Sequence, residues 1–296
     1  MHLTPLLPAD LDETLALVNG LHPTLRMSRD WLYARTLGHF ACPPEFMLLA
    51  REGDRVVGCC LAHEVEGRGI VKLFGVAEAY RRRGIATALF DALEARMRER
   101  GLGEVAVEAA APGYFLPGVD LRYTAALSFL FQRGYQSDRV SRVDMAVDLA
   151  HATLETADAE ARLAAAGITL RRARPEEVEG VAHWVLEVFG RGWQIETADA
   201  RIFSPTPLFI ALEGEKLIGF AVYDVTGPAR FGPTGTLPEY RGRGIGSALL
   251  HLCLRSLQER GEAQATIGWA GPIAYYARTV GAEISRVYWS FKKPLA

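Results

Sequence analysis

Two short segments of the chain combine arginine and glycine where an apolar run gives way to a helical pattern. They lie 160 positions apart and read Arg81-Arg82-Arg83-Gly84-Ile85-Ala86-Thr87 and Arg241-Gly242-Arg243-Gly244-Ile245-Gly246-Ser247. Backbone N–H groups of a tight turn at a helix N-terminus bind anions, glycine lets a ligand approach closely, and arginine adds positive charge. The spacing therefore predicts two sites for a phosphate-bearing ligand.

Other well-known phosphate-binding loops fit these residues poorly. A P-loop needs Gly-x-x-x-x-Gly-Lys-Ser/Thr, and neither segment carries that lysine. A dinucleotide-binding loop needs Gly-x-Gly-x-x-Gly in an opening βαβ unit. Here Gly242, Gly244 and Gly246 have a different spacing and follow three antiparallel-type strands. A dinucleotide-dependent oxidoreductase is therefore only a weak alternative.

The elements that must position these segments recur in the same order in both halves of the chain. In each half the arginine–glycine segment is preceded by a strand, then by a helix that begins at a proline and acidic residues, and then by a hairpin and a third strand. A helix, a strand, a second helix and a last strand follow it. The matched ranges are 6–11 with 173–178, 46–53 with 208–214, 55–61 with 216–222, 70–76 with 229–236, 85–100 with 245–260, and 104–109 with 265–269. We infer an internal duplication with the order β-α-β-β-β-α-β-α-β in each half.

The duplication predicts two domains of an α/β class with a mixed sheet. The N-terminal domain is expected over 1–149 and the C-terminal domain over 168–296. The stretch 150–167 between them is rich in alanine, which favours a helical linker over a flexible one.

Composition argues for an ordinary soluble protein. The chain has 296 residues, 49% hydrophobic and 23% charged, with a formal net charge of −2, so electrostatics give no case for nucleic-acid or membrane-surface binding. No run of about 18 apolar residues predicts a membrane span, and the N-terminus does not resemble a signal peptide. The cysteines show no CxxC spacing, which indicates reduced, buried thiols, a cytoplasmic location and no metal site. They are Cys42, Cys59, Cys60 and Cys253.

The loop spacing and strand order resemble those of the GNAT acetyltransferase superfamily over nearly the full length of both halves. Its signature, Gln/Arg-x-x-Gly-x-Gly/Ala, is met by Arg241, Gly244 and Gly246 and by Arg81, Gly84 and Ala86. The tandem arrangement is similar in layout to mycothiol synthase. The resemblance implies a tandem duplicated acyl-CoA N-acyltransferase fold, each half a mixed, largely antiparallel, twisted sheet flanked by helices.

The resemblance also implies acetyl-CoA (CoA) as the cofactor, with its pyrophosphate on the arginine–glycine loops and its pantetheine arm along the preceding strand. That strand splays from the next one in the family, and an exposed strand edge offers N–H and C=O groups to an amide-bearing ligand. Carried over by position, the cofactor-binding residues are Gly75, Val76, Arg81, Arg82, Arg83, Gly84, Ile85, Ala86 and Thr87, and Gly235, Thr236, Arg241, Gly242, Arg243, Gly244, Ile245, Gly246 and Ser247.

Family members commonly use a tyrosine on the helix after the splayed strand to protonate the leaving thiolate, since a phenol of pKa about 10 stays protonated at neutral pH. Tyr275 and Tyr276 lie on that helix in the second half, with Tyr276 five positions before Gly281. The same count back from Gly134 in the first half gives Phe129, which cannot donate. We therefore expect catalysis in the second half and a catalytically degenerate first half that could still bind CoA. Alternatively, the two tyrosines are packing aromatics.

The resemblance implies a primary amine of a small molecule or peptide as acceptor, in a monomer or homodimer without nucleic-acid or membrane partners. A non-catalytic acyl-CoA-binding or sensing protein is the alternative.

His63 and Asp224 are candidates for a general base, or solvated strand ends. The segment 112–123 is turn-rich and aromatic, and we expect it to pack between the halves or to cover a ligand site. Four residues could line an acceptor pocket or the core: Trp184, Phe189, Trp193 and Ile195.

Overall fold

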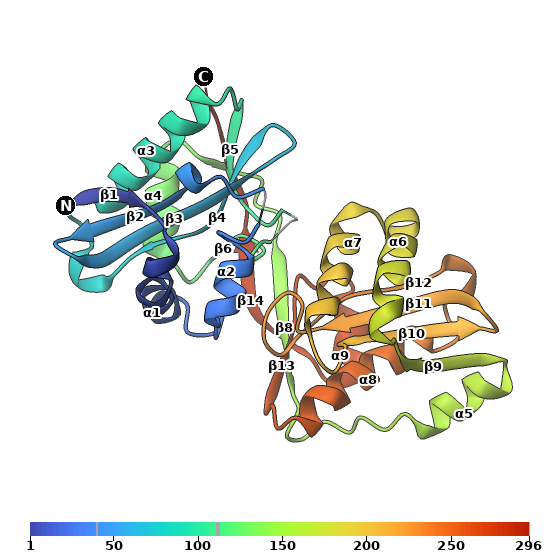
Figure 1. Ribbon diagram of the computed structural model, residues 1–296. Helices are drawn as coiled ribbons and strands as arrows, with labels where there is room; N and C mark the ends of the chain where they lie inside the picture. Colours follow the sequence, from blue (N-terminus) through green and yellow to red (C-terminus); the bar gives the residue numbers. More distant parts are fainter. Residues whose placement is uncertain (40, 111–112, 296) are drawn as a thin grey trace. The chain divides into compact units, whose positions relative to one another are not determined.

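In the computed structural model, which describes residues 1–39, 41–110 and 113–295, the chain forms two compact units (Figure 1). Unit 1 comprises Met1–Arg142 together with Val287–Ala296, and unit 2 comprises Val143–Arg286. Each unit contains a mixed sheet with helices on its faces, as the predicted fold class requires.

Unit 1 is built on a sheet with the strand order β1-β2-β3-β4-β5-β15-β7. Its strands are β1 (His2–Pro5), β2 (Met47–Glu52), β3 (Arg55–Val65), β4 (Arg68–Val76), β5 (Glu104–Val107), β7 (Gln136–Ser137) and β15 (Phe291–Pro294), and β6 (Val119–Asp120) lies outside this sheet. Its helices are α1 (Leu11–Leu21), α2 (Arg29–Ala34), α3 (Ile85–Glu99) and α4 (Thr124–Gln132).

Two apolar clusters fill the opposite faces of this sheet. Leu89, Phe90 and Leu93 of α3 belong to one cluster, and Leu11 and Val18 of α1 belong to the other. The strands between them are buried on both faces, so they read as continuous hydrophobic runs rather than alternating ones. Figure 1 shows α3 on one side of the strands and α1 and α2 on the other.

Unit 2 repeats this plan, and its sheet lies within the strand order β6-β14-β8-β13-β12-β11-β10-β9. Its strands are β8 (Arg142–Asp148), β9 (Ile168–Arg172), β10 (Leu208–Glu213), β11 (Lys216–Tyr223), β12 (Arg230–Thr236), β13 (Gln264–Ile267) and the first part of β14 (Glu283–Trp289), which continues into unit 1 from Val287. Its helices are α5 (Ala157–Ala165), α6 (Val178–Phe189), α7 (Arg191–Ala198), α8 (Ile245–Glu259) and α9 (Ile273–Val280). Figure 1 shows α6 and α7 on one side of β10–β12 and α8 on the other.

The two halves of the sequence exchange their last strands, which the predicted boundaries 1–149 and 168–296 did not anticipate. Strand β8, from the first half, pairs with β13 in unit 2, and β15, at the end of the chain, pairs with β5 and β7 in unit 1. Phe291 of β15 is 1% exposed in the core of unit 1, and Lys293 contacts the buried Glu94 at 2.8 Å. These contacts explain why the chain's end belongs to the first unit.

Other boundaries agree closely with the predictions. The two long helices begin at Ile85 and Ile245 as expected, and each is followed by a left-handed glycine, Gly101 and Gly261. The predicted helical linker contains α5 over part of its length.

Candidate functional site

The two arginine–glycine loops have the same backbone conformation. Gly84 and Gly244 are left-handed N-cap residues, with φ of 77° and 88°, at the start of the 15-residue helices α3 and α8. Two positions earlier Gly242 has φ 78°, and Arg82 adopts the same region with φ 65°. A non-glycine residue held there is uncommon, and such strain is concentrated at functional sites. The loop of unit 1 therefore keeps the backbone conformation of the unit 2 loop, although Arg82 stands where unit 2 has Gly242.

The loop glycines face open space. A Cβ added at Gly84, Gly242 or Gly244 would meet no heavy atom of the described residues within 4 Å, so a ligand could approach the backbone at these positions. The first N–H groups of a helix lack intrahelical acceptors and carry partial positive charge, which suits a pyrophosphate. Both loops thus fit the phosphate end of CoA.

The first arginine of each loop has a role that the sequence did not reveal. Arg81 Nε donates to Val76 O at 3.1 Å, and Arg241 Nε donates to Thr236 O at 3.3 Å. These arginines therefore fasten the loop to the end of the preceding strand as well as adding charge near it.

The strand before each loop separates from its neighbour, as the family resemblance implies. The parallel pairing of β4 with β5 runs from Arg68 to Val71, and that of β12 with β13 covers Arg230 and Phe231. Both β4 and β12 also show a register shift against their antiparallel neighbour close to this point, a device common beside active sites. Within the described residues, each strand thus has an edge beyond the split that a ligand's amides could use.

Gly75 and Gly235, expected on the pantetheine side, are glycines for a packing reason. A Cβ at Gly75 would lie 2.5 Å from Leu21 Cδ1, and one at Gly235 would lie 2.5 Å from Phe189 Cζ. The last residue of α1 or α6 thus rests on the strand at this point. A ligand would meet these two glycines through their backbone edge.

The tyrosines of α9 lie beside the loop and strand of unit 2. The Tyr275 hydroxyl is 3.6 Å from the Cβ position of Gly246, whereas Tyr276 is 6% exposed and packs against Phe231 with ring centroids 6.3 Å apart. Burial raises the pKa of Tyr275 to about 12, and burial followed by the neighbouring Tyr275 raises the pKa of Tyr276 to about 12. Both phenols can therefore donate a proton throughout the neutral range.

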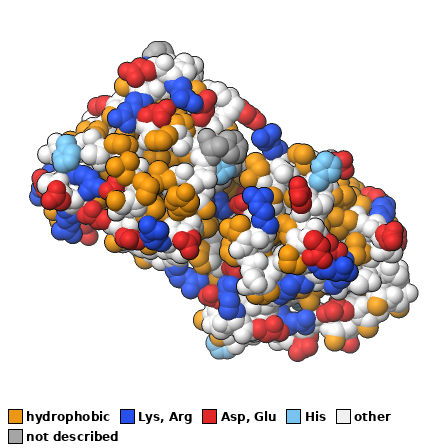
Figure 2. Space-filling model, viewed as in Figure 1, with side chains coloured by type: hydrophobic (Ala, Val, Ile, Leu, Met, Phe, Trp, Pro, Cys, Tyr) orange, Lys and Arg blue, Asp and Glu red, His pale blue; other side chains and the backbone are white. Residues whose placement is uncertain are grey.

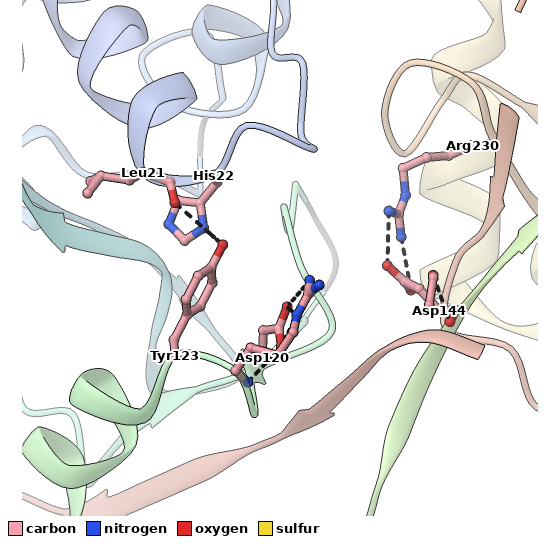
Figure 3. A network of polar contacts seen from close by, with 8 residues as sticks. Leu21, His22, Asp120, Tyr123, Asp144 and Arg230 are labelled. Carbon is pink, nitrogen blue, oxygen red and sulfur yellow. Dashed lines mark hydrogen bonds and ion pairs between the residues drawn. The ribbon is translucent and has the colours of Figure 1, made fainter. Parts of the chain in front are cut away.

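Unit 1 has a different side-chain arrangement at the matching helix. Phe129 of α4 packs against Phe74 and Phe90, with centroids 6.4 and 5.1 Å away. However, Tyr123 caps the start of α4, and its hydroxyl lies 3.2 Å from His22 Nδ1 (Figure 3). Sequence reasoning missed this pair, for which the only signal was a tyrosine at the end of a turn-rich segment.

Neither proposed general base faces an acceptor. His63 lies inside β3, which is longer than predicted, and is 0% exposed. Asp224 accepts from both Nη atoms of Arg260 and from the N–H of Ala229, so it closes the turn after β11. Both residues are structural.

His63 makes unit 1 sensitive to acid. Burial, with smaller contributions from Lys72 and His39, lowers the pKa of His63 to about 3 from 6.5. Between these values the unfolded chain binds a proton that the folded chain excludes, so stability falls as the pH drops. From pH 7 to pH 5 we expect a loss of roughly 2 kcal/mol in the free energy of unfolding.

Urea unfolding of wild type and His63→Gln at these two pH values measures this loss. The glutamine does not titrate, so the variant should lack this part of the pH dependence. Equal slopes in the two proteins would contradict the assignment.

The aromatic residues proposed for the acceptor side of unit 2 form one cluster. Phe189 lies 5.6 Å from both Trp184 and Phe220 and 5.4 Å from Trp193, measured between ring centroids. Trp193 is 40% exposed. The cluster therefore combines core packing with an accessible aromatic surface beside Gly235, and Ile195 is partly buried.

The aromatic segment 112–123 lies in unit 1, apart from Pro112, which is outside the described residues. Phe115 and Leu116 are buried in the same cluster as α1, so this part of the segment packs within the core of unit 1.

Charge distribution, cysteines and metal-ligand residues were the other sequence features with a bearing on function. Cationic and anionic side chains are interspersed on the face seen in Figure 2. All four cysteines are buried and unpaired with one another, and burial raises the pKa of Cys59 to about 12. Among the residues that the structure describes, no cluster of His, Cys, Asp or Glu is arranged to hold a metal ion. No helix in this part of the chain combines the length and hydrophobicity that crossing a bilayer requires.

Comparisons with solved structures give the same fold at low sequence identity. The chain is similar to a GCN5-related glucosamine N-acetyltransferase region of a fungal multi-domain β-N-acetylglucosaminidase, with TM-score 0.76 and 20% identity, covering 99% of this chain and 38% of that one. It is also similar to a GCN5-related N-acetyltransferase from Sphaerobacter thermophilus, with TM-score 0.70, 19% identity and coverage of 99% and 95%. A tandem GNAT protein from the clavulanic acid biosynthesis pathway gives TM-score 0.71, 18% identity and coverage of 100% and 98%.

The family comparison covers both halves of the chain. A search of curated protein sequences gave no match. The model of the acetyltransferase (GNAT) family matches residues 15–114 and 178–281, and each match contains one loop and one splayed strand. The chain therefore belongs to the acetyltransferase (GNAT) family, as a tandem member with one family domain in each half of its sequence.

Proposed function

We propose that the protein is an acetyl-CoA-dependent N-acetyltransferase that acts on a primary amine of a small molecule or peptide, with unit 2 catalytic. The observation that carries this proposal is the Tyr275 hydroxyl next to Gly246, in the first turn of the helix that follows the phosphate loop. Tyr275 as a proton donor and the loop as an anion-binding site would then both contact the same bound acetyl-CoA.

The residues of unit 2 would hold the cofactor along the loop and the strand edge. The backbone of 242–247 receives the pyrophosphate, and the edge of β12 near Gly235 and Thr236 pairs with the pantetheine amides. Bound acetyl-CoA supplies an acyl group activated as a thioester. The equivalent residues of unit 1, 75–76 and 81–87, are proposed to bind the same cofactor.

The chain's part in the chemistry is to position the reactants and to supply a proton. Tyr275 or Tyr276 donates its phenolic proton to the leaving sulfur, and both hold that proton at neutral pH because burial raises their pKa values. Tyr275 is the better placed of the two with respect to the loop.

The acceptor is proposed to approach beside the aromatic cluster of Trp184, Phe189 and Trp193, which offers apolar and cation–π contacts to an organic amine. One structural neighbour is a glucosamine N-acetyltransferase region, so amino sugars belong in the first panel of acceptors. The buried, unpaired cysteines of this chain suit a reducing compartment, and we propose a cytoplasmic location.

Phenylalanine substitutions of the two tyrosines test the assignment. In a chain whose unit 1 loop is blocked by Gly84→Val, so that unit 2 acts alone, removing the proton donor should lower kcat by about 10²–10⁴-fold, while the other substitution should change it little. The measurement is thiol release from acetyl-CoA with glucosamine, an aliphatic polyamine, an arylalkylamine and a peptide with a free amino terminus. Tyr33→Phe, at a residue 46% exposed in unit 1, is the control.

Two outcomes would reject parts of this proposal. Unchanged turnover in both Tyr275→Phe and Tyr276→Phe would remove these residues from catalysis. Binding of acetyl-CoA without turnover on any acceptor would favour the alternative, a non-catalytic acyl-CoA-binding or sensing protein.

A further inference from the structure

Unit 1 contains a small pocket at the place where β4 and β5 separate. Their pairing ends at Val71 and Val107, and the pocket begins at these residues. The following residues of β4, Lys72, Leu73 and Phe74, form part of its wall. The pocket therefore opens directly onto the strand edge along which the cofactor of this unit is proposed to lie.

Side chains from two further elements close this pocket. His22 comes from the residue after α1, Tyr123 from the start of α4, and Ala126 from the first turn of the same helix. The ring of Tyr123 meets that of His22 edge to face, with centroids 5.2 Å apart and an interplanar angle of 80°. The Tyr123 hydroxyl lies 3.2 Å from His22 Nδ1 and 3.4 Å from Leu21 O (Figure 3). A phenol is thus fixed in position against an imidazole at the cleft.

The phenylalanine at the expected tyrosine position does not exclude a proton donor in unit 1. Phe129, which the count back from Gly134 matched to the catalytic tyrosine, packs against Phe74 and Phe90. Counted from the helix start, Ala126 is the third residue of α4, as Tyr275 is the third residue of α9. A small side chain at this position leaves room for the pocket, and Tyr123 stands three residues earlier.

The charged groups that line the pocket already have ion-pair or hydrogen-bond partners. Lys72 Nζ contacts Cys42 Sγ at 3.0 Å and donates to the carbonyl of Arg35. Glu108 accepts from Arg68 at 2.6 Å, and Asp120 pairs with Arg122 at 2.7 Å. The tyrosine–histidine pair joins a phenolic proton donor directly to an imidazole nitrogen, a group that can accept or donate a proton.

We propose that unit 1 is a second acyl-transfer site, in which Tyr123 gives its proton to the leaving sulfur and His22 positions Tyr123 and passes a proton back to it. This inference rests on the proposed function of the family fold in this chain. The amine nitrogen bonds to the thioester carbonyl carbon and the carbon–sulfur bond breaks. The sulfur takes the Tyr123 proton, and the proton that the nitrogen loses returns to the phenolate oxygen through His22 Nδ1.

The pocket also limits what this site can transfer. Its volume is about 40 Å³, whereas a cavity needs roughly 10–15 Å³ by the corresponding measure to hold one water molecule. A space of this size, lined by residues such as Val119 and Ala126, suits a short acyl group. Unit 1 should therefore transfer acetyl in preference to longer chains.

Cofactor binding is measured first, by calorimetry with coenzyme A. Wild type should bind two molecules per chain. Gly84→Val and Gly244→Val should each remove one site, because a β-branched residue does not adopt the left-handed conformation that each loop needs. Gly84→Asn and Gly244→Asn, which tolerate that conformation, are matched controls for folding. A single site in wild type that Gly244→Val abolishes would overturn the proposal.

Turnover is then measured in the Gly244→Val background, where unit 1 acts alone. Thiol release with the same panel of amines should persist and should fall by about 10²–10⁴-fold on adding Tyr123→Phe, with little change in KM. Tyr123→Phe keeps the ring that packs on His22, and Tyr33→Phe is the exposed control. Ala126→Leu, which fills the pocket without touching the hydroxyl, should also abolish acetyl transfer while coenzyme A binding remains.

The role of His22 is tested through the pH profile. His22→Gln should lower kcat and remove the acid limb that an imidazole gives, whereas a purely structural role would leave the profile's shape unchanged. If Gly244→Val binds coenzyme A once per chain but releases no thiol, unit 1 is not a transfer site and the inference fails. If wild type releases none with any amine, the proposed function itself fails.

Discussion

Removing the chain from Phe291 onward is expected to unfold unit 1, although its helices and the other strands of its sheet end at Ser137, 154 residues earlier in the sequence. Strand β15 fills the space between β5 and β7, and its loss exposes the backbone of both. Phe291 and Leu295 also leave the core, where they are 1% and 8% exposed. Truncating one buried phenylalanine costs about 3–5 kcal/mol, and a domain's whole stability is about 5–15 kcal/mol.

A polar cluster adds to this loss. Glu94 is 3% exposed and contacts Lys293 at 2.8 Å, Arg133 at 2.9 Å and the Tyr135 hydroxyl at 3.0 Å. Without β15 the carboxylate loses Lys293, one of its three cationic partners beside Arg133 and the more exposed Arg98, and removing one partner of a buried pair is strongly destabilising.

Hydrogen exchange followed peptide by peptide distinguishes the units in this experiment. Protection should disappear in unit 1 and persist in β10–β12 of unit 2. The milder variant Phe291→Ala should lower the stability of unit 1 by about 3–5 kcal/mol. The exposed neighbour Lys292→Ala should change it by less than about 0.5 kcal/mol. Retained protection in β2–β4 after truncation would show that β15 is dispensable.

Asp144→Ala is expected to destabilise unit 2 by about 3–5 kcal/mol. Asp144 lies on the exchanged strand β8 and is 1% exposed, and its carboxylate oxygens contact the two Nη atoms of Arg230 at 3.1 and 3.2 Å (Figure 3). It also accepts from the N–H of Trp269 at 2.9 Å. Truncation leaves the guanidinium, itself 8% exposed, without this counter-charge in the interior.

Denaturant unfolding of unit 2 measures this effect. Asp148→Ala, on the same strand but with its carboxylate 63% exposed, should be nearly neutral. The double variant Asp144→Leu with Arg230→Met should recover much of the stability, because replacing both charges by apolar groups avoids the buried cation. Equal stability of Asp144→Ala and wild type would show that the ion pair is not needed.

The phosphate loops could be predicted from the sequence because their signals are local. The Arg-x-x-Gly spacing, the apolar run before it and the helical pattern after it lie close together in the sequence. The duplication repeats this combination in both halves of the chain. Even so, the bond from Arg81 to Val76 O depends on loop geometry that residue types do not encode.

The exchanged strands and the Tyr123–His22 pair could not be predicted, because each depends on contacts between distant residues. The buried positions on β8 would suit a strand of either sheet. The amino-acid composition of β8 does not indicate that β13 is the strand with which it pairs. Tyr123 and His22 are 101 positions apart. His63 was misplaced because β3 continues to Val65, two residues beyond it.

The strand exchange also determines the order in which the protein can be completed during synthesis. Domains normally fold in sequence as they emerge from the ribosome. Here the first 142 residues must wait for β15, which follows unit 2 in the sequence, so the growing polypeptide carries an unfinished sheet with the edges of β5 and β7 exposed. Such edges are sites of mispairing, and closing a loop of this length is slow. Unit 2 has its whole sequence before the last strand of unit 1 is made, so the half translated second is the half able to finish first.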